Sequence, residues 1–333
     1  MINIDKTRIF AEIREKDPKR ITLSAPDGLI NKVEDLAEEI QREFNIDTFI
    51  MGDSCYGSCD TTNNDSKIIG ADIAFNIGHT ISFEKLGDRT IMIDAFDDIG
   101  FENVVKKSVL QLKKYKKIGL VTFSQYIESI QNVKDLYEEN GISAEIGKGK
   151  GQLRDGQIFG CEFYPVDSIK EDVDAFVVLG RSNFHAISVS LVSDKPTFIL
   201  DPYSEEIINI QEISEERKKR AILSVYKARD ADKFGLIVGL KEGQYMMKQT
   251  LSLKTELEKR GKSVRLIAMR EVTSDRVSML RTIDAFIQTS CPRISTDGYT
   301  FDKPVLSVPQ AEALLNVLDG REPGEFLMKP NWL

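Results

Sequence analysis

Four cysteines are the residues of this sequence best suited to chemistry: Cys55, Cys59, Cys161 and Cys291. Cysteine thiolates bind zinc and iron–sulfur clusters, and in a reducing compartment a disulfide framework is not expected. The last three lie more than a hundred positions apart, each in a segment whose Gly, Pro or polar neighbours are typical of a loop. They are either ordinary buried cysteines or ligands of one shared metal site.

If these cysteines share a metal, zinc is the poorer candidate. Structural zinc sites usually take paired C-x₂₋₄-C ligands and close all four positions, and only Cys55 and Cys59 form such a pair. Three thiolates from distant segments suit a cubane iron–sulfur cluster better. Such a cluster keeps one iron open, and the open iron can bind a substrate as a Lewis acid.

Three further side chains have the right types and places for catalysis. His79 and His185 each follow a predicted strand, where a neutral imidazole can orient a substrate or act as a base near pH 7. Either histidine can equally be a loop cap. Arg293 stands two positions after Cys291, where it can offset negative charge or simply form a surface ion pair.

Four residues at strand ends are predicted to bind a cofactor: Gly78, Gly180, Gly239 and Gln244. The turn 239–244 joins a strand to a helix, and such turns offer backbone N–H groups to anions, here a carboxylate. The acidic run 94–98 is predicted to be a solvated loop rather than a pair of catalytic carboxylates. The sequence has no G-x-x-x-x-G-K-[ST] motif and no convincing G-x-G-x-x-G, so ATP and NAD roles lack support.

The elements that must position these residues follow one pattern that restarts at residues 21, 117 and 234. Each restart is a short apolar strand followed by a helix with apolar residues at helical spacing. Further strands follow each helix. The predicted strands are 21–26, 48–53, 71–78, 90–95, 117–123, 143–147, 175–180, 197–202, 234–240, 263–269, 285–290 and 305–309.

Alternation of strands with helices predicts parallel sheets, whose sites gather at the carboxyl ends of the strands. The spacing of the restarts favours three small α/β modules over one large sheet. We place them at 1–100, 101–212 and 213–333, so that each carries one of the cysteines at 59, 161 and 291. A charged helix near 214–220 leads into the third module.

Composition narrows the function classes. The chain has 333 residues, 41% hydrophobic content and a formal net charge of −8, which argues against binding nucleic acid through a basic surface. It has no run of 18 apolar residues and no apolar segment at its start, so neither a membrane helix nor a secretory signal is predicted. We expect a cytoplasmic protein with no membrane partner.

Several short motifs, in this order, resemble those of the diphthamide synthase family, the 2-(3-amino-3-carboxypropyl)histidine synthases of archaea and eukaryotes. The resemblance spans roughly residues 20–310, and no single motif decides it. The motifs are Ala25-Pro-Asp-Gly28, Tyr56-Gly-Ser-Cys59, Gly78-His79, Gly156-Gln-Ile-Phe-Gly-Cys161, Asn183-Phe-His185, Asp201-Pro-Tyr-Ser204, Phe234-Gly-Leu-Ile-Val-Gly239, Cys291-Pro-Arg293 and Lys303-Pro304.

The resemblance implies three homologous modules in a pseudo-threefold triangle around a [4Fe–4S] cluster held by Cys59, Cys161 and Cys291. It implies an archaeal-type homodimer that cleaves S-adenosylmethionine and transfers its 3-amino-3-carboxypropyl group, as a radical, to imidazole C2 of a histidine in elongation factor 2. An electron donor of unknown identity is also implied. Cys55 is not a ligand in the family motif, and we expect it to be a passive thiol.

Two alternatives remain open at this point. A quinolinate synthase-like dehydratase also joins three modules around a three-cysteine cluster, and it uses the open iron without cleaving S-adenosylmethionine. A cluster-bearing accessory subunit or redox sensor would have no activity of its own. The presence of all three cysteines favours a catalytic role.

Overall fold

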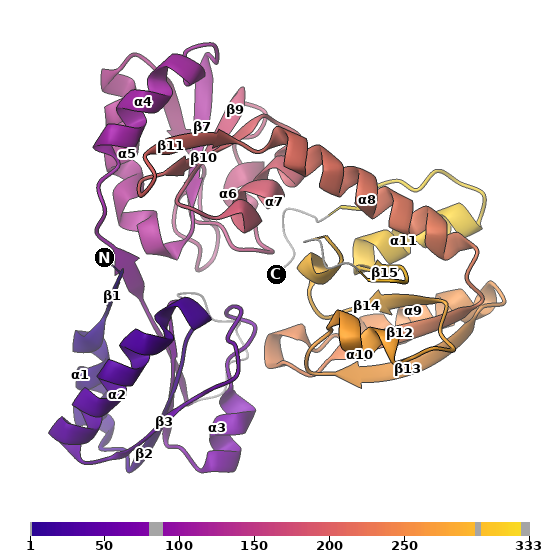
Figure 1. The fold of residues 1–333 in the computed structure, drawn as a ribbon, viewed down its shortest axis with the longest axis horizontal. Helices are drawn as coiled ribbons and strands as arrows, with labels where there is room; N and C mark the ends of the chain where they lie inside the picture. Colours follow the sequence, from indigo (N-terminus) through magenta and orange to yellow (C-terminus); the bar gives the residue numbers. More distant parts are fainter. Residues whose placement is uncertain (1, 80–88, 297–300, 328–333) are drawn as a thin grey trace.

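The computed structural model describes residues 2–79, 89–296 and 301–327. Figure 1 shows three α/β lobes around a common centre, and each lobe takes the strands of its main sheet from one continuous stretch of chain. We call them modules one, two and three. No helix of the described residues is both long and apolar enough to cross a membrane.

Module one contains a parallel sheet of order β3-β2-β4-β5. Its long helix α2 carries a buried stripe (Val33, Leu36, Ala37 and Ile40) at the i, i+3, i+4, i+7 spacing that packs a helix onto a sheet. The elements are α1 (Lys6–Lys16), β2 (Arg20–Ser24), α2 (Ile30–Phe44), β3 (Asp47–Ile50), α3 (Asn63–Ile69), β4 (Ile73–Ile77) and β5 (Thr90–Ile93).

Module two has the same parallel order, β8-β7-β9-β10, extended by the antiparallel edge strand β11. Its core lies on both faces of the sheet, which is why β9 is buried at every residue. The elements are α4 (Glu102–Leu112), β7 (Lys117–Thr122), α5 (Ile130–Glu139), β8 (Ser143–Ile146), α6 (Tyr164–Asp167), β9 (Ala175–Leu179), α7 (Asn183–Ser193), β10 (Thr197–Asp201) and β11 (Glu206–Asn209).

Module three repeats the order once more, as β13-β12-β14-β15. Helix α8 leads into it from module two and packs on α7 and on α11. The elements are α8 (Gln211–Arg229), β12 (Lys233–Gly239), α9 (Met247–Lys259), β13 (Ser263–Met269), α10 (Ser274–Ser278), β14 (Ala285–Gln288), β15 (Val305–Leu306) and α11 (Val308–Leu318).

The α/β class with parallel sheets is confirmed, and each predicted strand has an observed counterpart. The threefold relation between the modules and the boundaries at 100 and 212 stay predictions. Several strands are shorter than predicted, β15 most of all in proportion to its length: it ends at Leu306 because Ser307 caps helix α11, in a capping box with Gln310. Trp332, near the end of the third predicted module, lies outside the described residues.

The prediction of a solvated loop at 94–98 is wrong. Residues Ala95–Asp97 form strand β6, which pairs antiparallel with β1 (Ile2–Ile4) in a separate two-stranded sheet. Asp97 is only 5% exposed and accepts a hydrogen bond from the Tyr203 hydroxyl at 2.7 Å. The pairing partner of this run is the start of the chain, which local sequence does not reveal.

Candidate functional site

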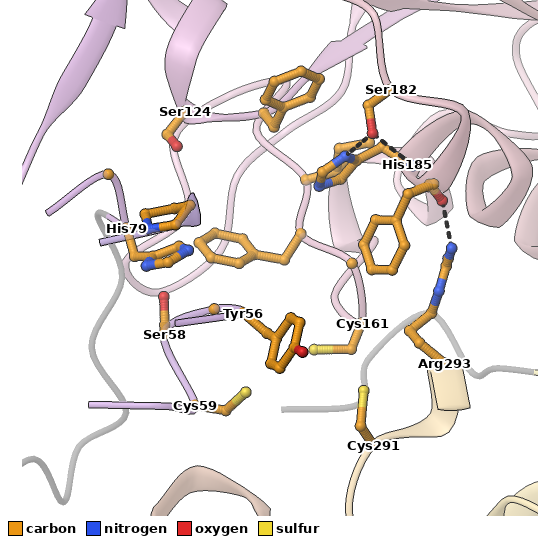
Figure 2. Close-up of a pocket in the computed structure, with 18 of the residues that line it drawn as sticks. Tyr56, Ser58, Cys59, His79, Ser124, Cys161, Ser182, His185, Cys291 and Arg293 are labelled. Atoms are coloured by element: carbon orange, nitrogen blue, oxygen red, sulfur yellow. Dashed lines mark hydrogen bonds between the residues drawn. The ribbon is translucent and has the colours of Figure 1, made fainter. Parts of the chain in front are cut away.

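A cavity of about 920 Å³ lies where the three modules meet, and Cys59, Cys161 and Cys291 all line it. The three side chains come from three different modules and turn their sulfur atoms toward a common space (Figure 2). The sequence prediction that one cysteine of each module reaches a shared site therefore agrees with the geometry. Their role as cluster ligands stays a prediction.

Each of these cysteines follows a strand of its module on the way from the carboxyl edge of the sheet, Cys291 closely and Cys59 and Cys161 after longer loops. Cys59 and Cys161 follow the second strands of their modules, β3 and β8, whereas Cys291 follows the third strand, β14. The three cysteines therefore do not occupy equivalent positions in the three modules. Position 270–271, beyond the second strand of module three, holds Arg270 and Glu271 instead of a cysteine.

The chemistry of this donor set fits a group that brings positive charge. Burial raises the pKa of the Cys161 thiol well above its usual range, and negative charge on Cys291 and Cys59 raises it further. Burial likewise raises the pKa of the Cys59 thiol. Three thiolates that face one another are unfavourable alone, and a bound metal reverses this because coordination deprotonates a thiol.

The same thiols do not suit a single ion. Among the described residues, no three His, Cys, Asp or Glu side chains are arranged to hold one metal ion. Thiolates that bind different irons of one cluster stand farther apart than thiolates that share one metal. The arrangement fits the predicted [4Fe–4S] cluster better than the zinc alternative.

Cys55 is not among the residues that line the cavity. Its thiol donates to the carbonyl oxygen of Asp60 at 3.2 Å, and the Asn76 amide lies 3.5 Å from its sulfur. Burial, with the negative charge of Asp60, raises its pKa to about 12. Cys55 thus lies among the residues that support the loop behind Cys59, and its passive role stays a prediction.

His79 lines the cavity, and its hydrogen bonds fix its tautomer. The Asn76 Nδ2 atom lies 3.3 Å from the Asp60 carbonyl oxygen, which can only accept, so Asn76 Oδ1 is the atom that faces His79 Nδ1 at 2.9 Å. Nδ1 therefore carries the proton, and Nε2 is the acceptor. Burial lowers the pKa of His79 to about 4, which keeps the ring neutral at pH 7.

His185 lines the cavity from the side of module two, in an aromatic wall. Its ring stacks on Phe123 with centroids 4.6 Å apart, and Phe184 meets it edge-on at 5.1 Å. Nδ1 lies 2.7 Å from the hydroxyl of Ser182, which caps helix α7. Burial, aided by the positive charge of Arg293, lowers the pKa of His185 to about 3.

Arg293 joins this wall to module three. Its guanidinium carbon lies 3.7 Å from the centroid of the Phe184 ring, and Nη2 donates to the Phe184 carbonyl oxygen at 2.7 Å. The residue lines the cavity yet is only 4% exposed, so the surface ion pair considered from sequence is excluded. A buried cation at this place favours anionic groups in the cavity.

Two of the four predicted cofactor-binding residues line the cavity, Gly78 and Gln244. Gly180 and Gly239 do not line it, and a cofactor-binding role for any of the four stays a prediction. Gly180 lies beneath the rings of Tyr126 and Phe123. A Cβ at this position would lie 2.7 Å from a Tyr126 ring atom and 2.8 Å from a Phe123 ring atom. Gly239 is packed against Ser290 and the backbone of Gln244.

Two amides of the turn that follows Gly239 donate to backbone carbonyl oxygens and are not available to an anion. The amide of Gly243 donates to the carbonyl oxygen of Cys59 at 2.9 Å, and the amide of Gln244 donates to that of Lys241 at 2.9 Å. These donors are already satisfied within the protein. Through Gly243, the turn of module three contacts module one instead.

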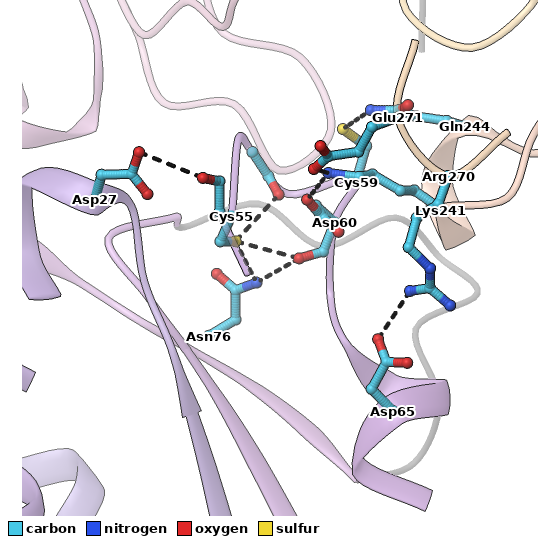
Figure 3. Close-up of polar contacts among 12 residues, drawn as sticks. Asp27, Cys55, Cys59, Asp60, Asp65, Asn76, Lys241, Gln244, Arg270 and Glu271 are labelled. Atoms are coloured by element: carbon cyan, nitrogen blue, oxygen red, sulfur yellow. Dashed lines mark hydrogen bonds and ion pairs between the residues drawn. The ribbon is translucent and has the colours of Figure 1, made fainter. Parts of the chain in front are cut away.

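Sequence reasoning missed the polar cluster beside Cys59 that Figure 3 shows. Lys241 is only 6% exposed, with Nζ 2.5 Å from an Asp60 carboxylate oxygen and 3.6 Å from Glu271. It also lies 4.5 Å from the centroid of the Tyr56 ring. An acidic residue directly after a cysteine was the one available signal, and its partner lies 181 positions away.

The comparison with known families decides the classification. The sequence model of the diphthamide synthesis family, described as putative diphthamide synthesis protein, matches residues 25–325. The chain belongs to this family. The resemblance inferred from the motifs is thereby confirmed, and it favours the synthase over the quinolinate synthase-like alternative.

Relatives of the family cover nearly the whole chain. The 2-(3-amino-3-carboxypropyl)histidine synthase of Pyrococcus horikoshii is 30% identical over 98% of this chain and 94% of its own length. Subunit 1 of the Schizosaccharomyces pombe synthase is 30% identical over 96% of this chain and 75% of its own. The relatives bear the name of a transferase, which agrees with the predicted enzyme class.

A solved structure has the same fold as this chain over nearly its whole length. The crystal structure of Dph2 from Pyrococcus horikoshii with a 4Fe-4S cluster is 28% identical, has a TM-score of 0.86, and covers 100% of this chain and 97% of that one. A cluster is thus present in a protein of this fold.

Proposed function

We propose that this chain is a 2-(3-amino-3-carboxypropyl)histidine synthase that catalyses the first modification of diphthamide biosynthesis. The observation that carries the proposal is the convergence of one thiol from each module on a single cavity. Family membership and the cluster in the Pyrococcus Dph2 structure support it. Cys59, Cys161 and Cys291 would hold a [4Fe–4S] cluster, and S-adenosylmethionine would be the co-substrate.

The net reaction balances without an external oxidant. The bond between the sulfonium sulfur and the aminocarboxypropyl carbon breaks, a bond from that carbon to imidazole C2 forms, methylthioadenosine leaves, and the C2 proton is released. When bound, the cluster would supply the electron that cleaves the sulfonium to a 3-amino-3-carboxypropyl radical, and it would take that electron back from the radical adduct as the adduct loses its C2 proton. It would also leave one iron open to the methionyl amine and carboxylate.

The residues of the chain supply position and charge. His79 presents an unprotonated Nε2, so we assign it the acceptance of the C2 proton. The buried guanidinium of Arg293 favours the methionyl carboxylate on the side of module three. His185 and its aromatic neighbours offer flat apolar faces to the adenosyl part, while Gly78 and Gln244 line the wall nearer module one.

The protein substrate proposed is elongation factor 2, because family membership implies modification of a translation factor. We also propose a homodimer in the cytoplasm, served by an electron donor not identified by sequence. The accessory-subunit alternative predicts that the purified chain alone forms no product, so single-chain activity decides between them.

The test is anaerobic reconstitution followed by iron counting and EPR of the dithionite-reduced protein, then addition of S-adenosylmethionine and elongation factor 2. We expect about four irons per chain, the cubane stoichiometry, and their loss in Cys59→Ala, Cys161→Ala and Cys291→Ala. Cys55→Ala is the matched control, because Cys55 shares the loop of Cys59 but lies outside the cavity. It should keep its iron.

The products separate the remaining alternatives. Methylthioadenosine together with a modified histidine in elongation factor 2 supports the synthase. A cluster that leaves S-adenosylmethionine intact points to the dehydratase or the accessory subunit. A chain that binds no iron, or holds zinc tightly, contradicts the proposal.

A further inference from the structure

The turn Lys241–Gln244 of module three contacts the Cys59 loop of module one with each of its four residues, and Figure 3 shows the contacts of Lys241 and Gln244. Lys241 pairs with Asp60, the residue directly after the cysteine. Glu242 accepts from the Thr61 hydroxyl at 2.5 Å and from the Asn64 amide at 2.7 Å. The loop that carries Cys59 is therefore held by a segment from another module.

Gly243 is the point of closest approach in this contact. A Cβ at this position would lie 2.5 Å from Cys59 Cα and 2.7 Å from its Cβ. Only glycine allows its amide to reach the Cys59 carbonyl oxygen at 2.9 Å. The backbone of the cysteine is thus fixed by a partner that tolerates no side chain.

Gln244 contacts the sulfur itself. Its Nε2 lies 3.2 Å from Cys59 Sγ, and the residue is only 8% exposed. A thiolate can only accept, so the amide nitrogen, not the oxygen, must face it. Hydrogen bonds to cysteine sulfurs stabilise added negative charge and raise the reduction potential of a cluster that the sulfur ligates.

We infer that Lys241–Gln244 is a positioning segment for Cys59, and that the Gln244 amide donates to the Cys59 sulfur and thereby raises the cluster's reduction potential. This inference rests on the proposed function, since it requires Cys59 to be a ligand. It gives module three two roles at one site: it supplies Cys291 and it orients the cysteine of module one.

The test is a midpoint potential of the reconstituted protein, followed by EPR during reductive titration. Gln244→Leu and Gln244→Met keep most of the volume and remove the N–H donor without adding charge. The matched control is Gln125→Leu, because Gln125 lines the cavity from module two and no contact from it to a cysteine is found among the described residues.

We expect both Gln244 variants to keep four irons with a midpoint shifted to more negative values, and Gln125→Leu to keep the wild-type midpoint. Loss of iron from folded Gln244→Leu, with iron kept in Gln125→Leu, also supports positioning. If Gln244→Leu does not fold, Gln244→Met is interpreted in the same way. Full iron with an unchanged midpoint overturns the inference, whereas wild-type protein without iron overturns the proposed function itself.

Discussion

Module three contacts its two neighbours in different ways. Toward module one it offers the Lys241–Gln244 turn and Arg270, whose partners are carboxylates, a hydroxyl and backbone groups. Toward module two, at the cavity, it offers Arg293, whose guanidinium lies on the Phe184 ring. The first contact is a chain of directed polar bonds, and the second combines one hydrogen bond with a cation–π interaction.

The difference follows from what each contact must fix. The loop of Cys59 is long and lies between β3 and α3, so partners from outside its module hold it. Cys291 is held within its own module, because the Gln288 side chain donates to the Cys291 carbonyl oxygen at 2.7 Å and accepts from the Cys291 amide at 3.0 Å. Cys59 is therefore held by polar contacts from another module, whereas Cys291 is held by a side chain of its own module.

The largest effect is predicted for a substitution that breaks the polar contact between modules three and one. In Lys241→Met the Asp60 carboxylate, 7% exposed, loses its partner, and an uncompensated buried charge costs about 3–5 kcal/mol. Urea unfolding should show this loss, together with faster alkylation of Cys59. Adding Asp60→Asn should recover at least half of it. A loss no larger than that of a surface pair would show that the two charges are not coupled.

The next largest effect is predicted for a substitution that breaks the Arg293 contact between modules three and two. Arg293→Met removes a charged hydrogen bond and a cation–π interaction, which together are worth about 2–4 kcal/mol. Thermal or urea unfolding measures it. Because Arg293 helps to lower the pKa of His185, NMR titration of that ring should show a higher pKa in the variant. An unchanged His185 pKa would contradict this coupling.

Acid should weaken both walls of the cavity. The pKa values of His79 and His185 in the folded protein, about 4 and about 3, lie below the ordinary value of 6.5, so the unfolded chain binds protons first. Their contribution is complete above pH 6.5 and falls as the pH drops toward 4, by about 1.4 kcal/mol per pH unit for each histidine.

Urea unfolding of the iron-free chain between pH 7 and pH 4 measures this slope. In His185→Phe, which keeps an aromatic ring against Phe123, the slope should fall by the share of one histidine. An unchanged slope would mean that His185 does not stay neutral when folded.

The smallest effect tests whether exposed ion pairs matter in the contact with module one. Arg270 lies 2.9 Å from Asp65, but its side chain is half exposed, and such pairs are worth about 0–1 kcal/mol. Arg270→Met should therefore change the free energy of unfolding by less than 1 kcal/mol and leave Cys59 as slow to alkylate as before. If Arg270→Met lost as much unfolding free energy as Lys241→Met, the exposed Arg270–Asp65 pair would matter as much as the buried pair of Lys241 and Asp60.

The sequence predicted the elements whose signals are local. The strands at 21, 117 and 234 are apolar runs, and Gly141 and Gly261 end helices in the left-handed conformation that favours glycine. The cysteines were found because their type and loop setting are unusual in themselves. Family resemblance then supplied the roles that spacing alone left open.

The sequence did not predict what depends on contacts between modules. The 239–244 turn looked like an anion-binding turn because nothing local shows that Gly243 meets Cys59. Asp97 looked solvated because both of its partners are distant in sequence. Its strand pairs with the start of the chain, and its carboxylate meets Tyr203, 106 positions away. Such contacts become visible only when the fold brings distant segments together.

The placement of Cys291 in the third module has a consequence for synthesis on the ribosome. Domains fold in order as the chain emerges, so modules one and two can form while only two of the three thiols exist. The turn that steadies Cys59 also emerges late, after more than 240 residues. If the three thiols hold the proposed cluster, its assembly waits until the segment through Cys291 has been made, because a product that ends before Cys291 lacks one of the three thiols.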